Sequence, residues 1–268
     1  MPDLYIMKLG GSVCTNKAEN QFRVNEGAVR NTAKEIARAR KEKKFRLIMV
    51  NGAGPFGHTN VANYNINNGL KSAKDFEGFC KVAIDCNFLN QEVSRIFWEE
   101  GLLAYPLAAS AITIQKNKKI SSQGISVIEE LFRQNQEIIP VLNGTMCPDI
   151  KLKGSVVSGD ATIANIAKKL KAKKIFLGTD VAGVFTADPK KEKNAKRIEL
   201  INKKNFDEII EQAGESTAID VTQGMKGKLL KIRQMSSGIE TIVFDATKPE
   251  NVFNALVGKE VEGTKIRL

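Results

Sequence analysis

The sequence predicts an α/β fold: a three-layer αβα sandwich around a mainly parallel, open sheet. Short hydrophobic segments alternate with longer amphipathic ones along the whole chain, and polar glycine-rich segments follow several of the hydrophobic ones. Alternation of this kind is typical of parallel strands joined by helices that cover both faces of a sheet. The chain has 268 residues, of which 42% are hydrophobic, so it can bury a substantial core.

Four strands are expected in the first half of the chain, at residues 4–9, 45–50, 102–107 and 137–142. Amphipathic helices are expected between them, at residues 25–44, 73–100 and 124–135. Asn25 can cap the first helix, and Ser72 with Asp75 resembles a capping box at the start of the second. After the fourth strand, the segment TMCPDIKLKGSVV predicts a hairpin that turns over KLKG.

The second half of the chain repeats the alternation. Helices are expected at residues 158–172, 204–213, 224–236 and 248–257. Strands are expected at residues 173–179, at 241–244 and in the C-terminal TKIRL. Either Ser158 or Asp160 lies near the start of the first of these helices. Because no Ser/Pro-rich linker interrupts the chain, we expect two lobes of one continuous α/β body, residues 1–150 and 151–268.

The net charge of +11 makes nucleic acid a candidate partner. The lysines occur in short runs, of which KKLKAKK at 168–174 is the longest. Ile163, Ile166, Ala167 and Leu170 lie on one face of the helix that leads into this run, so its lysines fall largely outside the apolar stripe. Little arginine and few aromatic residues are interleaved with the lysines, which argues against base stacking. We therefore expect solvated helix surfaces and no nucleic-acid partner, although the positive field would attract phosphorylated small molecules.

Neither a membrane span nor a metal centre is expected. No apolar run approaches the roughly 20 residues that a membrane helix needs, and the start MPDLYIMKLGG lacks the charged and apolar regions of a signal peptide. The four cysteines show no CxxC spacing, and a single histidine cannot complete a usual zinc set. These features favour a cytoplasmic protein whose thiols are reduced and mostly buried.

Polar, glycine-rich segments follow the predicted strands where ligands collect in open α/β sheets. They are KLGGSVCTNK at 8–17, NGAGPFGH at 51–58, NGTMCPD at 143–149 and GTDVAGVF at 178–185, and SGD at 158–160 precedes a helix. Glycine amides and helix starts suit phosphate, and Lys8, Lys17 and Lys228 can supply positive charge. There is no P-loop, no GxGxxG after the first strand and no GxSxG, and His58 is the only histidine, so a catalytic triad has little support.

The order of these motifs resembles the amino acid kinase superfamily and, within it, the isopentenyl phosphate kinases. The segments that carry the resemblance are MKLGGSVCTNK, VNGAGPFGH, PVLNGTMCPD, VVSGDATIANIAKKL, LGTDVAGVFTADP, DVTQGMKGK and GKEVEGTKIRL. They span nearly the whole chain. The most discriminating parts are Lys8, Gly10, Gly11 and Ser12 with Lys17 nine residues after Lys8, and the glycine loop that ends in Phe56–Gly57–His58.

The resemblance implies the amino acid kinase fold, an N-terminal lobe that binds the acceptor, a C-terminal lobe that binds ATP, and a homodimer. It implies that ATP with Mg²⁺ phosphorylates an isoprenoid monophosphate, isopentenyl phosphate, on its phosphate. The catalytic residues implied are Lys8, Lys17, His58, Asp160 and Lys228. The ATP-binding residues implied are Lys8, Gly10, Gly11, Ser12, Thr179, Asp180, Gly183, Gly224 and Lys228. The acceptor-binding residues implied are Gly52, Ala53, Gly54, Gly57, His58, Phe79 and Gly159.

The chain departs from the family pattern near both clefts, at Asn51, Ala53, Asn143–Thr145, Ala182 and Gln223. Two alternatives therefore stay open: a kinase of another small anionic acceptor, of the fosfomycin-kinase type, and a nucleotide-binding protein that does not transfer phosphate. An isoprenoid tail needs an apolar channel, for which the predicted helix at 73–100 offers Phe76, Phe79, Val82, Ala83, Cys86 and Phe88. The segment NYNINNGL at 63–70 is more polar than such a channel requires.

Overall fold

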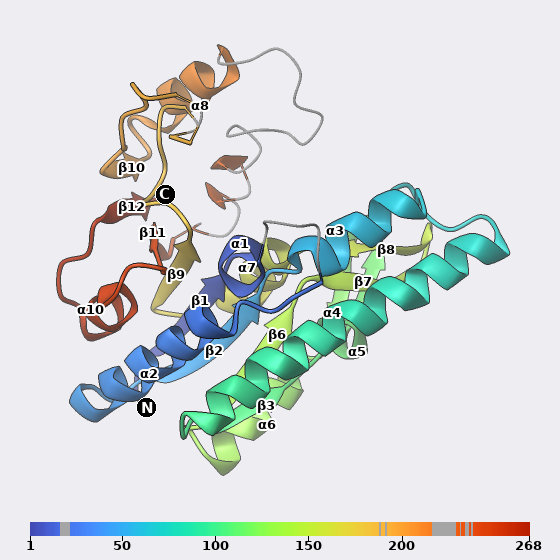
Figure 1. Ribbon diagram of the computed structural model, residues 1–268, viewed down its shortest axis with the longest axis horizontal. Helices are drawn as coiled ribbons and strands as arrows, with labels where there is room; N and C mark the ends of the chain where they lie inside the picture. The colour runs from blue at the N-terminus through green and yellow to red at the C-terminus, as the bar shows by residue number, and fades with distance from the viewer. Residues whose placement is uncertain are drawn as a thin grey trace.

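The structure is a computed structural model (Figure 1) that describes residues 1–16, 22–187, 189–190, 192–215, 229–230, 232–233, 236 and 238–268. Three of the residues that the sequence assigns to the site, Lys17, Gly224 and Lys228, lie outside the described residues, and so does most of the helix expected at 224–236. Their assignments stay predictions.

A mostly parallel sheet of eight strands forms the centre of the molecule. The sequence predicts such a sheet and seven of its strands, but not the short β10 (Leu200–Asn202). The strand order is β10-β12-β11-β9-β1-β2-β6-β3. The strands are β1 (Leu4–Leu9), β2 (Arg46–Asn51), β3 (Ala104–Pro106), β6 (Ile139–Asn143), β9 (Lys174–Thr179), β10 (Leu200–Asn202), β11 (Glu240–Asp245) and β12 (Gly263–Arg267). All neighbours run parallel except β11 and β12, which are antiparallel. The strand expected at 102–107 is shorter than predicted.

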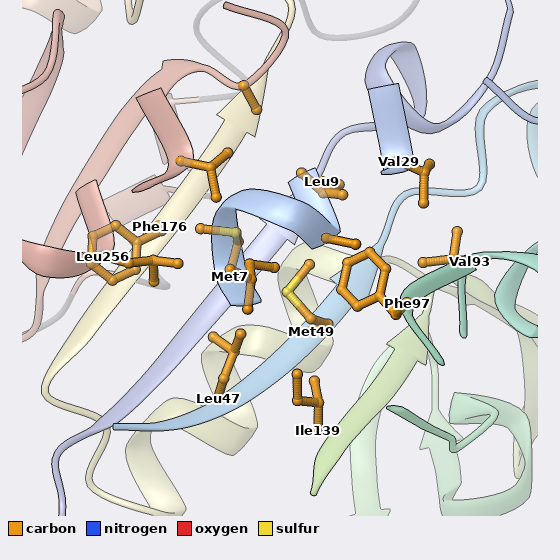
Figure 2. Close-up of a cluster of buried hydrophobic side chains, with 14 of the residues drawn as sticks. Met7, Leu9, Val29, Leu47, Met49, Val93, Phe97, Ile139, Phe176 and Leu256 are labelled. Carbon is orange, nitrogen blue, oxygen red and sulfur yellow. The ribbon is translucent and has the colours of Figure 1, made fainter. Parts of the chain in front are cut away.

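Helices cover both faces of this sheet because alternate strand residues face opposite sides. Met7 and Leu9 belong to a core with α2 (Glu26–Glu42), α4 (Ala73–Glu99) and α10 (Asn251–Val257). Figure 2 shows side chains of β1 and β2 meeting those of α2 and α4 in this core. On the other face, Leu4 and Ile6 pack with α6 (Ile125–Gln134), α7 (Gly159–Lys169) and α8 (Phe206–Glu215). The three-layer αβα sandwich is thus confirmed.

The predicted N-caps of α2 and α4 are present in the structure. The Asn25 side chain accepts a hydrogen bond from the Ala28 amide at the start of α2. Ser72 and Asp75 form the expected capping box of α4, with each side chain bonded to the other residue's backbone N–H. Both signals are read correctly from the sequence because a cap is decided by residues three positions apart.

A smaller sheet was predicted only in part. Its order is β5-β4-β7-β8, and its strands are β4 (Thr113–Lys116), β5 (Lys119–Gln123), β7 (Thr145–Asp149) and β8 (Lys153–Val157). The β7–β8 pair is the expected hairpin, whereas β4 and β5 were not expected. Asp149 joins the two hairpins by accepting the Lys118 and Leu152 amides and the Ser155 hydroxyl at 2.7–3.0 Å. Burial alone would raise the pKa of Asp149, but these donors lower it below its ordinary value.

Three helices escaped prediction: α1 (Gly11–Cys14), α3 (Gly54–Asn63) and α5 (Ala109–Ile112). Two of them have a single turn, and α3 begins in a glycine-rich segment without apolar periodicity, with Pro55 in its first turn. Proline is tolerated there because the first helical amides lack partners within the helix.

The sheet runs continuously through both halves of the chain, since β1 pairs with β2 on one side and with β9 on the other. The division into lobes at 150 and 151 falls in the turn of the β7–β8 hairpin and stays a prediction. Among the described residues, no helix is long and apolar enough to cross a membrane. Three cysteines are buried as expected, while Cys80 is exposed on α4.

Candidate active site

Four parallel strands end at one edge of the central sheet, and the predicted site segments follow them there. In the strand register, Leu9 of β1 lies beside Asn51 of β2 and beside Gly178 of β9. Asn51 in turn lies beside Asn143 of β6. The turns that begin at Gly10, Gly52, Gly144 and Asp180 therefore gather at the same edge. This is the place where open α/β sheets bind their ligands.

The glycine turns after β1 and β2 touch backbone to backbone. A Cβ atom at Gly11 would lie 2.6 Å from the Gly54 nitrogen, and a Cβ atom at Gly52 would collide with the Gly11 nitrogen. The Gly52 amide donates to the Leu9 carbonyl at 2.8 Å, and the Gly10 amide donates to the Gly178 carbonyl at 2.8 Å. The close contact of the two turns is itself a reason for these glycines, in addition to the expected approach of phosphate.

Lys8 and Asp160 form an ion pair at this edge, although 152 residues separate them. The two side chains are 21% and 22% exposed, so the pair is shielded and still accessible to a ligand. Asp160 is in the first turn of α7, where Ser158 caps the helix by accepting the Ala161 amide at 3.1 Å. A Cβ atom at Gly159 would lie 3.8 Å from Lys8 Cε, so the amino end of α7 lies beside the lysine. A helix start adds positive potential at the same point.

Ser12 and Asp180 connect the turns after β1 and β9. The Ser12 hydroxyl donates to Asp180 Oδ1 at 2.6 Å, and Lys190 forms an ion pair with the other carboxylate oxygen. Sequence reasoning missed Lys190, because nothing in the run KKEK distinguishes a lysine of the site from a solvated one. Thr179 Oγ1 donates to the Val181 carbonyl at 2.8 Å and so shapes the turn.

Gly183 continues this turn in a conformation that requires glycine. Its φ is +128°, and a Cβ atom would lie 2.6 Å from Thr264 Oγ1. The structure therefore brings Gly10, Gly11, Ser12, Thr179 and Asp180 to one corner of the edge, with Gly183 anchoring the segment that follows.

His58 occupies α3 and not a loop, which corrects the sequence-based expectation. It lies on the exposed side of the helix, one turn after the first helical residue, Gly54. Two neighbours fix its position: Phe56 is buried, and a Cβ atom at Gly57 would lie 2.7 Å from Ala53 Cβ and 3.3 Å from Cys86 Sγ. The histidine therefore lies on a helix that packs against α4 and begins at the contact between the two glycine turns.

An apolar cluster adjoins α3 and α4. Its buried members are Ile66, Leu70, Val82, Cys86 and Met146, and its partly buried members are Ala53, Val61, Tyr64, Phe79 and Val156. The β8 strand approaches closely, since a Cβ atom at Gly154 would lie 2.7 Å from the Phe79 ring.

Only part of the predicted apolar channel belongs to this cluster. Phe79, Val82 and Cys86 do, at every third or fourth position of α4. Phe76 is 43% exposed with Lys153 above its ring, and Phe88 is 49% exposed and stacks on Phe56. Phe88 points away because it lies two positions beyond Cys86, on another side of the helix.

The thiols near the site are not nucleophiles. Burial raises the pKa of Cys14 to about 12, although Lys8 and the Gly52 amide act in the opposite direction. Burial likewise raises the pKa of Cys86 to about 12. A neutral thiol is a poor nucleophile, so these cysteines are not candidates for covalent catalysis. The charged side chains that the structure describes at the site are Lys8, Asp160, Asp180 and Lys190. In the part of the chain that the structure describes, no three acidic, cysteine or histidine side chains are grouped to hold a metal ion.

Comparison with known proteins adds an independent finding. The model of the amino acid kinase family matches residues 3–245. Proteins named isopentenyl phosphate kinase from Methanothermobacter thermautotrophicus and Methanocaldococcus jannaschii are each 32% identical to the chain, and each alignment covers 98% of both chains. A solved structure entitled "X-ray structures of isopentenyl phosphate kinase" superposes with a TM-score of 0.83 at 30% identity, covering 98% of this chain and 99% of that one.

Proposed function

The chain belongs to the amino acid kinase family, and we propose that it transfers the γ-phosphoryl group of ATP to isopentenyl phosphate, giving isopentenyl diphosphate and ADP. The nature of the acceptor is supported by the names of relatives that align over nearly the whole chain. The observation that supports the proposed chemistry is the Lys8–Asp160 pair, which lies between the glycine turns and the start of α7. The lysine charge, the glycine amides and the helix start together suit the transfer of an anionic phosphoryl group.

In the proposed reaction, an oxygen of the acceptor's phosphate attacks the γ-phosphorus of ATP, and the bond from that phosphorus to the ADP oxygen breaks. A phosphomonoester has a second pKa of about 6, so the attacking oxygen is already deprotonated at neutral pH and no general base is needed. Catalysis then consists of positioning and charge stabilisation. We assign the stabilising charge to Lys8, which Asp160 orients through their ion pair.

The acceptor's phosphate is assigned to the turn of Gly52, Ala53 and Gly54 and to His58, with Gly57 and Gly159 close by. Support comes from the amino ends of α3 and α7, which both face this edge and favour anions. The apolar tail is assigned to the cluster that contains Phe79. Gly57 lies close to Cys86, since a Cβ atom there would be 3.3 Å from Cys86 Sγ, so the phosphate and tail regions adjoin and a molecule with a phosphate head and a short apolar tail would fit both.

ATP is assigned to the other side of the edge, at Lys8, Gly10, Gly11, Ser12, Thr179, Asp180 and Gly183. Lys17, Gly224 and Lys228 are assigned to ATP and to catalysis by resemblance alone. Mg²⁺ usually keeps several waters and binds phosphates with only one or two carboxylates. Asp160 and Asp180 lie at the ends of the glycine turns, and both are already paired with lysines, so the ATP phosphates would supply most ligands.

The decisive test measures ATP consumption and product formation by the purified protein with isopentenyl phosphate, with a phosphonate of the fosfomycin type, and without acceptor. We expect acceptor-dependent ADP release and isopentenyl diphosphate with the first compound only. Turnover of the phosphonate alone would favour the rival kinase. ATP binding without turnover of any acceptor would favour a non-catalytic nucleotide-binding protein.

A homodimer is also proposed, and an exposed apolar surface beside the β3 edge of the sheet supports it. β3 is the last strand of the eight-stranded sheet. Tyr105 of β3 is 46% exposed, and along the adjacent α4 the side chains of Ile84, Phe88 and Trp98 are 63%, 49% and 68% exposed. Ile84, Phe88 and Trp98 lie on one face of α4 together with Gln91 and Arg95, because these five positions are spaced three or four residues apart.

Light scattering tests this interface. We expect a dimer for the wild-type protein and for Ile150→Lys, which changes a residue of the β7–β8 turn that is 63% exposed, close to the 68% of Trp98. Trp98→Lys should give a monomer. A dimer that withstands Trp98→Lys would show that the α4–β3 surface is not the interface. A cytoplasmic location stays a prediction from the sequence.

A further inference from the structure

Buried side-chain amides connect α4 to the two strand ends beneath the glycine turns. The Asn90 side chain donates to Asn51 Oδ1 at 3.0 Å and to the Val141 carbonyl at 2.9 Å. The Asn143 side chain donates to the Cys86 carbonyl at 3.0 Å and accepts the Ala109 amide at 2.9 Å. Asn51, Asn90 and Asn143 are each at most 1% exposed. The mechanism described above uses none of these three side chains.

The orientation of the Asn51 amide follows from its neighbours. The Val141 carbonyl can only accept, so the Asn90 nitrogen must face it, and that nitrogen's second hydrogen points to Asn51. Asn51 must then present its oxygen to Asn90. Among the described residues, its own amide nitrogen has no hydrogen-bond partner, although it is buried. A buried donor without a hydrogen-bond partner destabilises the folded protein, so stability alone does not explain why Asn51 and Asn90 are paired in this way.

These hydrogen bonds hold the part of α4 that borders the apolar cluster. Asn51 and Asn143 immediately precede Gly52 and Gly144, the first residues of their turns. Their partners Asn90 and Cys86 are one helical turn apart on α4, and Cys86 also lines the apolar cluster. Hydrophobic contacts are non-directional and would tolerate small movements of α4 along the sheet, whereas hydrogen bonds to two strand ends would not.

We propose that Asn51 and Asn90 are a positioning pair that sets the distance between the glycine turn and the apolar wall carried by α4. This proposal rests on the proposed function: the turn would hold the acceptor's phosphate and the wall its tail. The pair would thus determine how well an acceptor of given length reaches both sites at once. ATP, assigned to the turns after β1 and β9, would be unaffected. Neither amide touches the reacting atoms, so both act through the elements that they hold.

Steady-state kinetics of Asn51→Ala, Asn90→Ala and the double variant test the pair. Each single change should raise the KM for isopentenyl phosphate roughly three- to tenfold, the range expected for one lost hydrogen bond. The KM for ATP should not change. The double variant should resemble the singles, because either change already breaks the pair. Asn51→Asp, which retains an oxygen facing Asn90, should recover part of the loss.

Ser94→Ala is the matched control, because the Ser94 hydroxyl is buried one turn further along α4 and donates within the helix, to the Asn90 carbonyl at 2.8 Å. It should leave both KM values unchanged. Effects of Asn51→Ala and Asn90→Ala that simply add, or that raise the two KM values equally, would overturn the proposal.

Amide hydrogen exchange gives a readout that does not depend on the reaction. Asn90→Ala should speed exchange in residues 82–90 and in the turn at 52–54, and Ser94→Ala should not. If the wild-type protein does not phosphorylate isopentenyl phosphate, the proposed function fails, but the exchange result still decides whether the pair holds α4. Unchanged exchange at both places in a folded Asn90→Ala variant would refute the pair. If Asn51→Ala does not fold, Asn90→Ala breaks the pair from the other side, and its comparison with Ser94→Ala carries the test.

Discussion

Replacing Lys8 by methionine tests the assignment of the charge that stabilises phosphoryl transfer. Methionine keeps much of the length and the apolar stem of lysine but has no charge. Two unit charges at 4 Å interact by about 4 kcal/mol at an effective dielectric constant of 20. The net value of one charge-assisted hydrogen bond is smaller, about 1.5–3 kcal/mol. The Lys8 side chain is 21% exposed, so water weakens but does not abolish its field.

This magnitude corresponds to a reduction of kcat by roughly 10- to 150-fold, since each 1.4 kcal/mol is a factor of ten. The loss should appear in kcat more than in ATP affinity, because charge on the transferring group changes most in the transition state. Asp160→Asn should lower kcat less, by about tenfold, because Lys8 keeps its charge and loses only its orienting partner. The expected change in stability is small, about 1 kcal/mol at most, because the ion pair is partly exposed.

The assay combines steady-state kinetics at saturating isopentenyl phosphate, calorimetric titration of ATP, and a thermal melt of each variant. A folded Lys8→Met protein with kcat near that of the wild type would refute the assigned role. Loss of ATP binding in proportion to kcat would show that Lys8 holds the ground state, and a large fall in melting temperature would assign the ion pair to stability.

Three further predictions follow from the same structure. His58→Ala should lower kcat/KM for the acceptor by roughly 10- to 150-fold while leaving ATP binding unchanged, and His58→Gln should recover part of it; equal losses for both substrates would contradict this. Phe79→Ala should improve use of longer isoprenyl monophosphates relative to isopentenyl phosphate, because it opens the apolar cluster beside β8; an unchanged preference would remove this side chain from the pocket wall. The pKa of Asp149 is lower in the folded protein than its ordinary value, so its contribution to stability is complete above about pH 4 and is lost as the pH falls through the folded-state pKa. Melting temperatures between pH 2 and 7 should therefore fall more steeply on acidification for the wild type than for Asp149→Asn, and parallel curves would contradict this.

Much of the fold could be predicted because its signals are local. The alternation of apolar and amphipathic segments located seven of the eight strands of the central sheet, all but β10, and its main helices, and the caps at Asn25 and Ser72 followed from residues three positions away. The missed elements lack such signals. α3 begins among glycines and a proline, and β4 and β5 are short strands whose pairing depends on Asp149, about thirty residues further along the chain.

The candidate site, like the fold, has features that the sequence predicts and features that it does not. The residue types and the location of the candidate site could be predicted from the sequence, since glycines, lysines and aspartates at strand ends indicate a phosphate site, and the roles of the individual residues stay predictions. Their mutual contacts could not. Only the tertiary structure pairs Lys8 with Asp160, presses Gly11 against Gly54, and places His58 on a helix.

The sequence by itself therefore determined most strands of the central sheet and its long helices, and which residue types carry charge near the strand ends. The tertiary structure decided which strand ends are neighbours, why Gly11 and Gly52 must be glycine, and how Asn51 and Asn90 join the β2 turn to α4. The physical reason is the range of the interactions. Periodicity and capping act within a few residues, whereas the ion pair and the amide pair join residues that are 152 and 39 positions apart and meet only when the sheet assembles.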